Sequence, residues 1–311
     1  MNNYLENLNE EQKLPVLHKD GPLIVIAGAG SGKTRVLTYR IIHLINEGVD
    51  PFNILALTFT NKAALEMKNR ISLITSESVS RSIWMGTFHS IFARILRSEA
   101  PLIGYPTNFT IYDTYDSEKL ISNIIKEKKL DKDTYKAKSI KNRISSLKNN
   151  FITVENYFNN SELIEVDKAA KRDLFGEIYQ EYVRRCFKAS VMDFDDLLLK
   201  TNELLNKSPE TLLKYQQKFK YILVDEYQDT NYSQYLIVKA LADRHENLCV
   251  VGDDSQSIYS FRGANIDNIL NFKKHYPNSI SYKLEQNYRS TKNIVQAANS
   301  LINHNLSLIH I

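Results

Sequence analysis

The sequence contains little cysteine and no long hydrophobic run. Its two cysteines, Cys186 and Cys249, have neither metal-ligand nor redox spacing, which argues against a zinc site or a disulfide framework. No apolar stretch approaches the ~20 residues that span a bilayer. The N-terminus also lacks the basic and apolar regions of a signal peptide. These absences predict a cytoplasmic protein that does not enter a membrane.

The chain also has only a small excess of positive over negative charge. The net charge is +4 over 311 residues, which by itself does not indicate a nucleic-acid-binding protein. The charge is unevenly distributed, because residues 119–150 hold ten Lys/Arg and three Asp/Glu, a local excess of +7. Such a run is as consistent with a solvated helix face as with a surface that binds a polyanion. The sequence leaves both interpretations open.

A glycine-rich segment follows the first apolar run, Leu23 to Ile26. Its backbone N–H groups can surround phosphate oxygens, its lysine can reach the outer phosphates, and its threonine hydroxyl can ligate Mg²⁺. The strict pattern begins with Gly, whereas this chain has Ala, so a glycine turn without a ligand stays open on this motif alone. The residues are Ala27, Gly28, Ala29, Gly30, Ser31, Gly32, Lys33 and Thr34.

Short apolar runs alternate with helical patterns, which indicates an α/β fold with a parallel sheet covered on both faces. The runs cover residues 23–26, 54–57, 83–85, 221–224 and 248–251. In such sheets ligands bind beyond the carboxyl ends of the strands, and the unusual residue clusters of this chain all follow the runs. Residues 108–192 break the alternation. Their helical spacing and lack of strand patterns predict an inserted helical domain.

Two of these clusters carry residues suited to hydrolysis and to stacking. Asp225 and Glu226 follow a buried run, where they could hold Mg²⁺ and orient or deprotonate an attacking water. Gln256 could contact a γ-phosphate or that water. Tyr259 and Phe261 lie two apart and could present their rings to bases, or both could belong to the core.

Seven segments in order closely resemble the UvrD/Rep/PcrA family of superfamily-one DNA helicases. They are residues 8–12, 27–34, 58–64, 86–89, 225–230, 252–263 and 284–290. The resemblance implies a RecA-like P-loop motor domain at residues 1–107 and 193–283. It implies a helical domain inserted at residues 108–192, and the start of a second motor domain at residues 284–311.

The resemblance also implies roles in ATP and Mg²⁺ binding. Gln12 would read the adenine, and Arg35 and Tyr288 would sandwich it. Residues 27–34 would hold the phosphates, with Mg²⁺ at Thr34 and Asp225. Glu226 would be the catalytic base, Gln256 would sense the γ-phosphate, and Arg289 would act as an arginine finger beside Lys33.

A single-strand track is implied at the same sheet edge. Its residues would be Phe59, Thr60, Asn61, Thr87, His89, Tyr259, Phe261 and Arg262. Phe59 and His89, like Phe88 between them in the sequence, could instead belong to packing. Two positions depart from the family pattern, since relatives usually have Trp at Phe261 and Phe at Tyr227. The first departure implies weaker stacking.

The function implied is ATP-dependent 3′→5′ DNA unwinding in repair, recombination or replication. The expected partners are single-stranded DNA and duplex–single-strand junctions, with other repair proteins possible, and the chain is expected to be a monomer or to self-associate weakly. Because the family continues through a second motor domain, we expect a truncated product that does not unwind alone. The helicase portion of an AddA/RecB-type helicase–nuclease is an alternative. A P-loop kinase acting on a small molecule is another.

Overall fold

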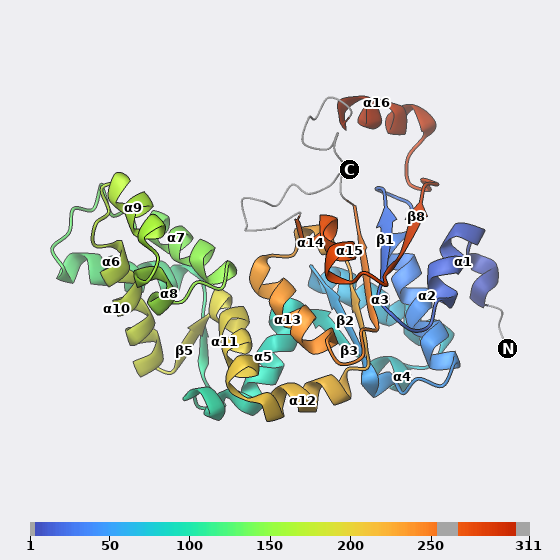
Figure 1. The fold of residues 1–311 in the computed structure, drawn as a ribbon, viewed down its shortest axis with the longest axis horizontal. Helices are drawn as coiled ribbons and strands as arrows, with labels where there is room; N and C mark the ends of the chain where they lie inside the picture. The colour runs from blue at the N-terminus through green and yellow to red at the C-terminus, as the bar shows by residue number, and fades with distance from the viewer. Residues whose placement is uncertain (1–3, 254–266, 303–311) are drawn as a thin grey trace. The chain divides into compact units, whose positions relative to one another are not determined.

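The computed structural model describes residues 4–253 and 267–302. The chain divides into two compact units, which Figure 1 shows as ribbons. The sheet unit comprises residues 1–91, 212–230 and 238–311, and the helical unit comprises residues 92–211 and 231–237. Three helices cross the boundaries between these ranges: α5 (Phe88–Glu99), α12 (Pro209–Lys218) and α13 (Tyr232–Ala242).

The sheet unit is built on six parallel strands in the order β3-β2-β6-β7-β1-β8. Five of them are the runs predicted from the sequence: β1 (Leu23–Ala27), β2 (Ile54–Thr58), β3 (Trp84–Thr87), β6 (Tyr221–Val224) and β7 (Leu248–Gly252). Nearly every residue of the central strands is buried, as the continuous apolar runs require. The predicted α/β fold with a parallel sheet is confirmed.

The sixth strand, β8 (Ile280–Leu284), was missed in the sequence. It pairs with β1 at the edge of the sheet, with Leu23 opposite Ile280 and Ala27 opposite Leu284. Only Leu284 of this strand is fully buried. Its sequence alternates polar and apolar residues, and it therefore lacks the continuous apolar run by which the central strands were predicted. The described residues after β8 include α16 (Lys292–Ile302). A second motor domain starting at residue 284 stays a prediction.

Helices of the sheet unit cover one face of the sheet with an apolar core. This core joins buried side chains of β1, β2 and β7 to those of α1 (Glu10–Leu17), α2 (Lys33–Asn46) and α3 (Asn61–Ile74). Short helices complete the unit: η1 (Tyr4–Asn7), η2 (Pro51–Asn53), α4 (Glu77–Ser82), η4 (Tyr227–Asp229), α14 (Asp267–Leu270) and α15 (Phe272–His275). Because all six strands are parallel, the predicted clusters after them share one edge.

The helical unit contains the predicted apolar spacing. Ile121, Ile124 and Ile125 pack in one core with Ile140 and with residues of three further helices. Its elements are η3 (Ala100–Ile103), α6 (Thr114–Glu127), α7 (Ala137–Asn149), α8 (Val154–Phe158), α9 (Ser161–Ala169), α10 (Phe175–Lys188) and α11 (Phe194–Lys207).

The expectation that residues 108–192 hold no strand is wrong in one detail. Two short strands, β4 (Thr110–Tyr112) and β5 (Val191–Asp193), pair in parallel within the helical unit. Three-residue strands are too short to show a periodicity, so the sequence pattern could not reveal them.

The basic run at residues 119–150 is partly neutralised inside the helical unit. Lys148 is fully buried between two aspartates, Arg143 pairs with Asp167, and Lys128 pairs with Glu177.

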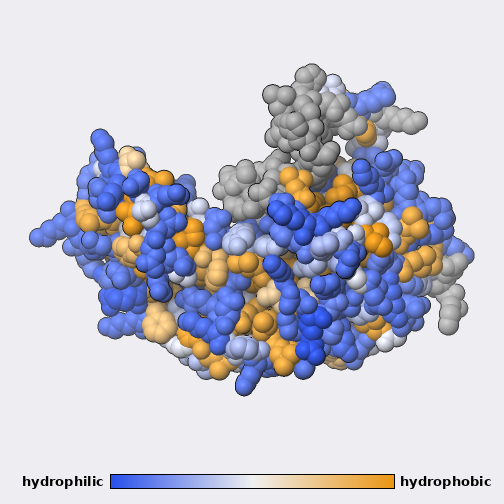
Figure 2. Space-filling model, viewed as in Figure 1, coloured by the Kyte–Doolittle hydropathy of each residue, from blue (hydrophilic) through white to orange (hydrophobic). Residues whose placement is uncertain are grey.

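The hydropathy surface in Figure 2 shows hydrophilic residues over much of the visible face, with apolar residues scattered among them. None of the helices described is both long and apolar enough to cross a membrane.

Candidate nucleotide-binding site

The glycine-rich segment forms a tight loop between β1 and α2. Gly30 and Gly32 adopt φ angles of +75° and +96°, in the left-handed region that favours glycine. A Cβ on Gly30 would lie 2.6 Å from the Cβ of Arg289, and a Cβ on Gly32 would lie 2.7 Å from Nε2 of Gln12. Ala27, where the strict pattern has Gly, is the last residue of β1 and is buried in extended backbone that tolerates a methyl group. The loop conformation of a phosphate site is therefore present.

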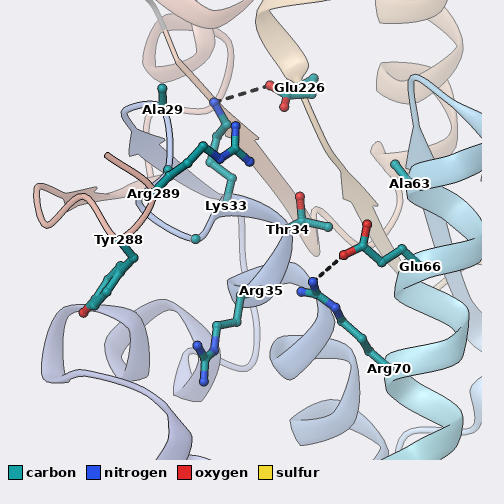
Figure 3. Close-up of a pocket in the computed structure, with 12 residues that line it drawn as sticks. Ala29, Lys33, Thr34, Arg35, Ala63, Glu66, Arg70, Glu226, Tyr288 and Arg289 are labelled. Carbon is teal, nitrogen blue, oxygen red and sulfur yellow. Dashed lines mark hydrogen bonds and ion pairs between the residues drawn. The ribbon is translucent and has the colours of Figure 1, made fainter. Parts of the chain in front are cut away.

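Lys33 and Thr34 begin α2 and meet carboxylates that follow β6 and β7. Thr34 Oγ1 donates a hydrogen bond to Asp225 Oδ2 at 3.1 Å. Lys33 Nζ lies 3.5 Å from Glu226 Oε2 and 3.7 Å from Asp253 Oδ2 (Figure 3). The structure brings together Lys33, Thr34, Asp225 and Glu226, whereas Asp253 had no role assigned from the sequence.

The Lys33 ammonium is poised for an anionic ligand. The residue is 7% exposed, yet its Nζ makes no hydrogen bond to any residue within 4–253 or 267–302. A buried ammonium that has ion-pair neighbours but no hydrogen bond retains three N–H donors for phosphate oxygens. The first turn of α2 adds the positive end of the helix dipole. This donor set fits a nucleotide phosphate.

The acidic groups of the site are buried and crowded. Burial, followed by the neighbouring Glu226 carboxylate, raises the pKa of Asp225 to about 7. The same two causes raise the pKa of Asp229 to about 6. A divalent cation beside Thr34 and Asp225 would favour the ionised carboxylate, since a bound ion is the largest local charge in such a site. The hydroxyl and carboxylate oxygens fit Mg²⁺.

A cavity of about 360 Å³ opens beside the loop. Figure 3 shows the Lys33 side chain directed toward Glu226 and the Glu66 side chain directed toward Arg70, each pair joined by a dashed line. The wall of the cavity includes Ala63, Glu66 and Arg70 of α3, which the sequence analysis did not assign to the site. These three recur at helical spacing after a predicted cluster, which is the signal that could have revealed them. The remaining lining residues are Ala29, Gly30, Gly32, Lys33, Thr34, Arg35, Glu226, Tyr288 and Arg289.

The segment after β8 is bonded to the glycine-rich loop. Tyr288 N donates to Gly30 O at 2.9 Å, and Asn287 Nδ2 donates to Ala29 O at 2.5 Å. Asn287 Oδ1 also accepts hydrogen bonds from the backbone N–H groups of Arg289 and Ser290. The Asn287 side chain, to which the motif pattern assigned no role, thus places Arg289 beside the loop.

Of the three residues expected to hold a base, Arg35 and Tyr288 line the cavity and Gln12 lies outside its lining. Gln12 is buried, donates to Ser31 O at 3.0 Å, and closes a capping box at the start of α1 with Asn9. Tyr288 is exposed, and its hydroxyl accepts a hydrogen bond from Asn9 Nδ2 at 2.6 Å. Arg35 lines the same cavity and donates to Asn7 O. Both planar groups proposed to sandwich an adenine therefore border the cavity.

The described candidates for a single-strand track follow β2 and β3, two neighbouring strands. Phe59 is half-buried, while Thr60 and Asn61 are exposed at the start of α3. Thr87 ends β3, and burial lowers the pKa of the half-buried His89. Phe88, by contrast, is 2% exposed and belongs to the packing. Four further expected residues lie outside the described part of the chain: Gln256, Tyr259, Phe261 and Arg262.

The comparisons with known proteins agree with this geometry. Residues 8–277 match the family described as the UvrD/REP helicase N-terminal domain. The chain belongs to this family. The predicted resemblance is confirmed, and the chain matches the N-terminal domain of this family.

Three similar relatives are each named ATP-dependent DNA helicase PcrA. The protein from Leuconostoc citreum is 48% identical over 299 residues, covering 96% of this chain and 39% of the relative. The one from Bacillus subtilis (strain 168) is 49% identical, covering 98% and 40%. The one from Staphylococcus epidermidis (strain ATCC 12228) is 48% identical, covering 98% and 41%. The chain thus spans about two fifths of the length of the curated relatives it matches.

Proposed function

We propose that this chain is the ATP-binding motor portion of a DNA helicase that moves 3′→5′ along single-stranded DNA and separates duplexes. The observation that carries the proposal is the meeting of Lys33 and Thr34 with Glu226 and Asp225 at one sheet edge. The relatives are named ATP-dependent DNA helicases, which supports a DNA helicase over a kinase that phosphorylates a small molecule. DNA repair, recombination or replication would be the setting, in the cytoplasm, with junction DNA and repair proteins as partners.

The chemistry of hydrolysis is divided among residues around the loop. The backbone of residues 27–32 would hold the phosphates, and the Lys33 ammonium would donate hydrogen bonds to the outer phosphates. Thr34 and Asp225 would hold Mg²⁺, which neutralises charge on phosphate oxygens when bound. Glu226 would accept a proton from the attacking water, and Arg289 would stabilise charge that develops on the γ-phosphate.

The base would be held at the other end of the cavity. Gln12 retains a second N–H on Nε2 and a second lone pair on Oε1, which suit the donor and acceptor edge of adenine. Arg35 and Tyr288 would supply the planar surfaces on either side of the ring. Gln256 would report the γ-phosphate.

DNA would bind at the same sheet edge, so ATP turnover and strand movement can be coupled. Phe59 and His89, with Tyr259 and Phe261, would stack bases or line the strand. Thr60, Asn61, Thr87 and Arg262 would contact its backbone, which makes affinity fall as salt rises. The chain alone is proposed to be a monomer or to self-associate weakly.

Nucleotide and DNA binding by the purified chain test the proposal. We expect the chain to bind Mg²⁺-ATP and single-stranded DNA and to hydrolyse ATP slowly. The substitution Glu226→Gln should reduce single-turnover hydrolysis by about 10²–10⁴-fold and leave nucleotide affinity nearly unchanged, because it alters only the group that handles water. Glu162→Gln, at an exposed position of α9 in the helical unit, is the matched control.

Two outcomes would contradict the proposal. A chain that binds ATP but has no affinity for single-stranded DNA at low salt would favour a nucleotide-dependent enzyme of another class. Equal losses of affinity and turnover in Glu226→Gln would mean that Glu226 holds the nucleotide and does not handle water.

A further inference from the structure

The Gln228 side chain links the segments that follow β6 and β7, two neighbouring strands, and contacts the Glu226 carboxylate. Its Nε2 donates a hydrogen bond to Glu226 Oε2 at 2.8 Å. Its Oε1 accepts one from the backbone N–H of Asp253, directly after β7, at 3.0 Å. Gln228 is 1% exposed. The amide itself is therefore buried, while the Glu226 side chain is 34% exposed and lines the cavity beside the loop.

The amide satisfies both partners at once. A backbone N–H can only donate, and an ionised carboxylate can only accept, so these neighbours also fix which end of the amide carries the oxygen. A glutamate at 228 could accept from Asp253 but would oppose the charge of Glu226. A methionine has similar length and could make neither strong bond.

Two backbone features show that the surroundings are shaped for this side chain. A Cβ on Gly252 would lie 2.7 Å from Ile269 Cδ1 and 2.8 Å from Gln228 Oε1, so the absence of a side chain at 252 leaves room for both side chains. Glu226 adopts φ +50° and ψ +48°, a left-handed conformation that is uncommon for a residue with a side chain. Such a conformation persists where surrounding contacts hold it, and Gln228 provides one.

Glu226 has a second neighbour that a nucleotide would engage. Lys33 Nζ lies 3.5 Å from the same Oε2 atom that accepts from Gln228. Phosphate oxygens would compete for the Lys33 ammonium, whereas the Gln228 amide is bonded on both sides within the protein. Of these two contacts, the one to the amide is therefore the one for which phosphate oxygens do not compete.

We propose that Gln228 is a positioning residue for ATP hydrolysis: it holds the Glu226 carboxylate against the water it activates and fixes it to the backbone after β7. This inference rests on the proposed function and names a residue that acts through Glu226 without touching the nucleotide.

The test compares Gln228→Met with wild type in single-turnover hydrolysis and in equilibrium binding of Mg²⁺-ATP. We expect hydrolysis to fall tenfold or more while the nucleotide Kd changes less than threefold, because Lys33, Thr34 and the loop backbone are unchanged. Gln228→Met should add no further loss in a Glu226→Gln background, since the group it positions has already been disabled. Gly252→Ala, which crowds the same amide from β7, should reproduce the loss of hydrolysis.

Gln216→Met is the matched control, because Gln216 is buried and its amide donates to Ala240 O at 2.7 Å within α12 and α13. It should lower the melting temperature and leave the hydrolysis rate unchanged. Normal hydrolysis by Gln228→Met would overturn the inference, as would a full further loss in the Glu226→Gln background. A wild-type chain that hydrolyses no ATP would instead overturn the proposed function.

Discussion

Each unit of this protein buries a lysine between two carboxylates, and the two lysines differ in how they are bonded. In the helical unit, Lys148 Nζ lies 2.7 Å from Asp193 and 2.8 Å from Asp196. In the sheet unit, Lys33 Nζ lies 3.5 Å from Glu226 and 3.7 Å from Asp253 and makes no hydrogen bond within the described residues. Both lysines are nearly or fully buried. The two lysines are thus alike in burial and charge and differ in their hydrogen bonds.

The difference separates a structural ion pair from a binding site. The Lys148 cluster is internally satisfied, because Tyr182 also donates to Asp193 at 2.7 Å and the backbone carbonyl of Lys148 accepts from Ser233. Burial alone would lower the pKa of this lysine, but the two aspartates hold it well above its ordinary value. The Lys33 site leaves N–H donors unused. A buried polar group without a hydrogen bond is costly, and a ligand can relieve that cost.

Breaking the Lys148 cluster should give the largest effect on stability. Lys148→Met leaves two buried carboxylates without their cation and should lower the free energy of unfolding by about 3–5 kcal/mol. Chemical denaturation, with hydrogen exchange read on α7 and α11, measures this loss. Lys128→Met is the control, since its half-exposed pair with Glu177 should cost less than about 1 kcal/mol. A loss of under 1 kcal/mol from Lys148→Met would remove the distinction between the two lysines.

The same substitution at Lys33 should act on binding, with a smaller effect on stability. Lys33→Met should reduce Mg²⁺-ATP affinity at least tenfold, about 1.4 kcal/mol, because it removes a charge from the phosphates. The free energy of unfolding should change by about 1 kcal/mol or less, since no hydrogen bond is lost. Isothermal titration and denaturation of the same preparation give both values. Destabilisation equal to that of Lys148→Met would show that Lys33 is a structural ion pair.

The smallest effect concerns Asp229, whose Oδ1 is buried without a hydrogen bond among the described residues. Burial and Glu226 raise its pKa to about 6, so the ionised carboxylate destabilises the fold increasingly as pH rises from about 4 to about 6. Asp229→Asn should therefore stabilise the protein by about 1–2 kcal/mol above pH 6 and by nothing near pH 4. Melting curves across this range test it, with the exposed Asp243→Asn as control. A gain that does not vary with pH would contradict the assignment.

Much of the sheet unit was predictable because its signals are local. A buried parallel strand is a continuous apolar run, and a phosphate loop needs glycine at the two left-handed positions, Gly30 and Gly32. Strands whose residues alternate or number only three gave no such signal, so β8, β4 and β5 were missed. Lys148 was counted in a basic run because its aspartates follow it by more than forty residues.

The sequence by itself determined the family, the parallel sheet and the identity of the loop residues, since motif order and strand pattern are written along the chain. Tertiary structure decided which carboxylates lie beside Lys33. It also decided that Gln228 bonds both Glu226 and Asp253. It placed the Asn287 side chain in a hydrogen bond with the glycine-rich loop. These contacts depend on strand order, which brings β6, β7, β1 and β8 side by side although they lie far apart in the sequence. The spacing of residues along the chain does not reveal which strands are neighbours. The hydrogen bonds that distinguish Lys148 from Lys33 likewise form only in the folded state.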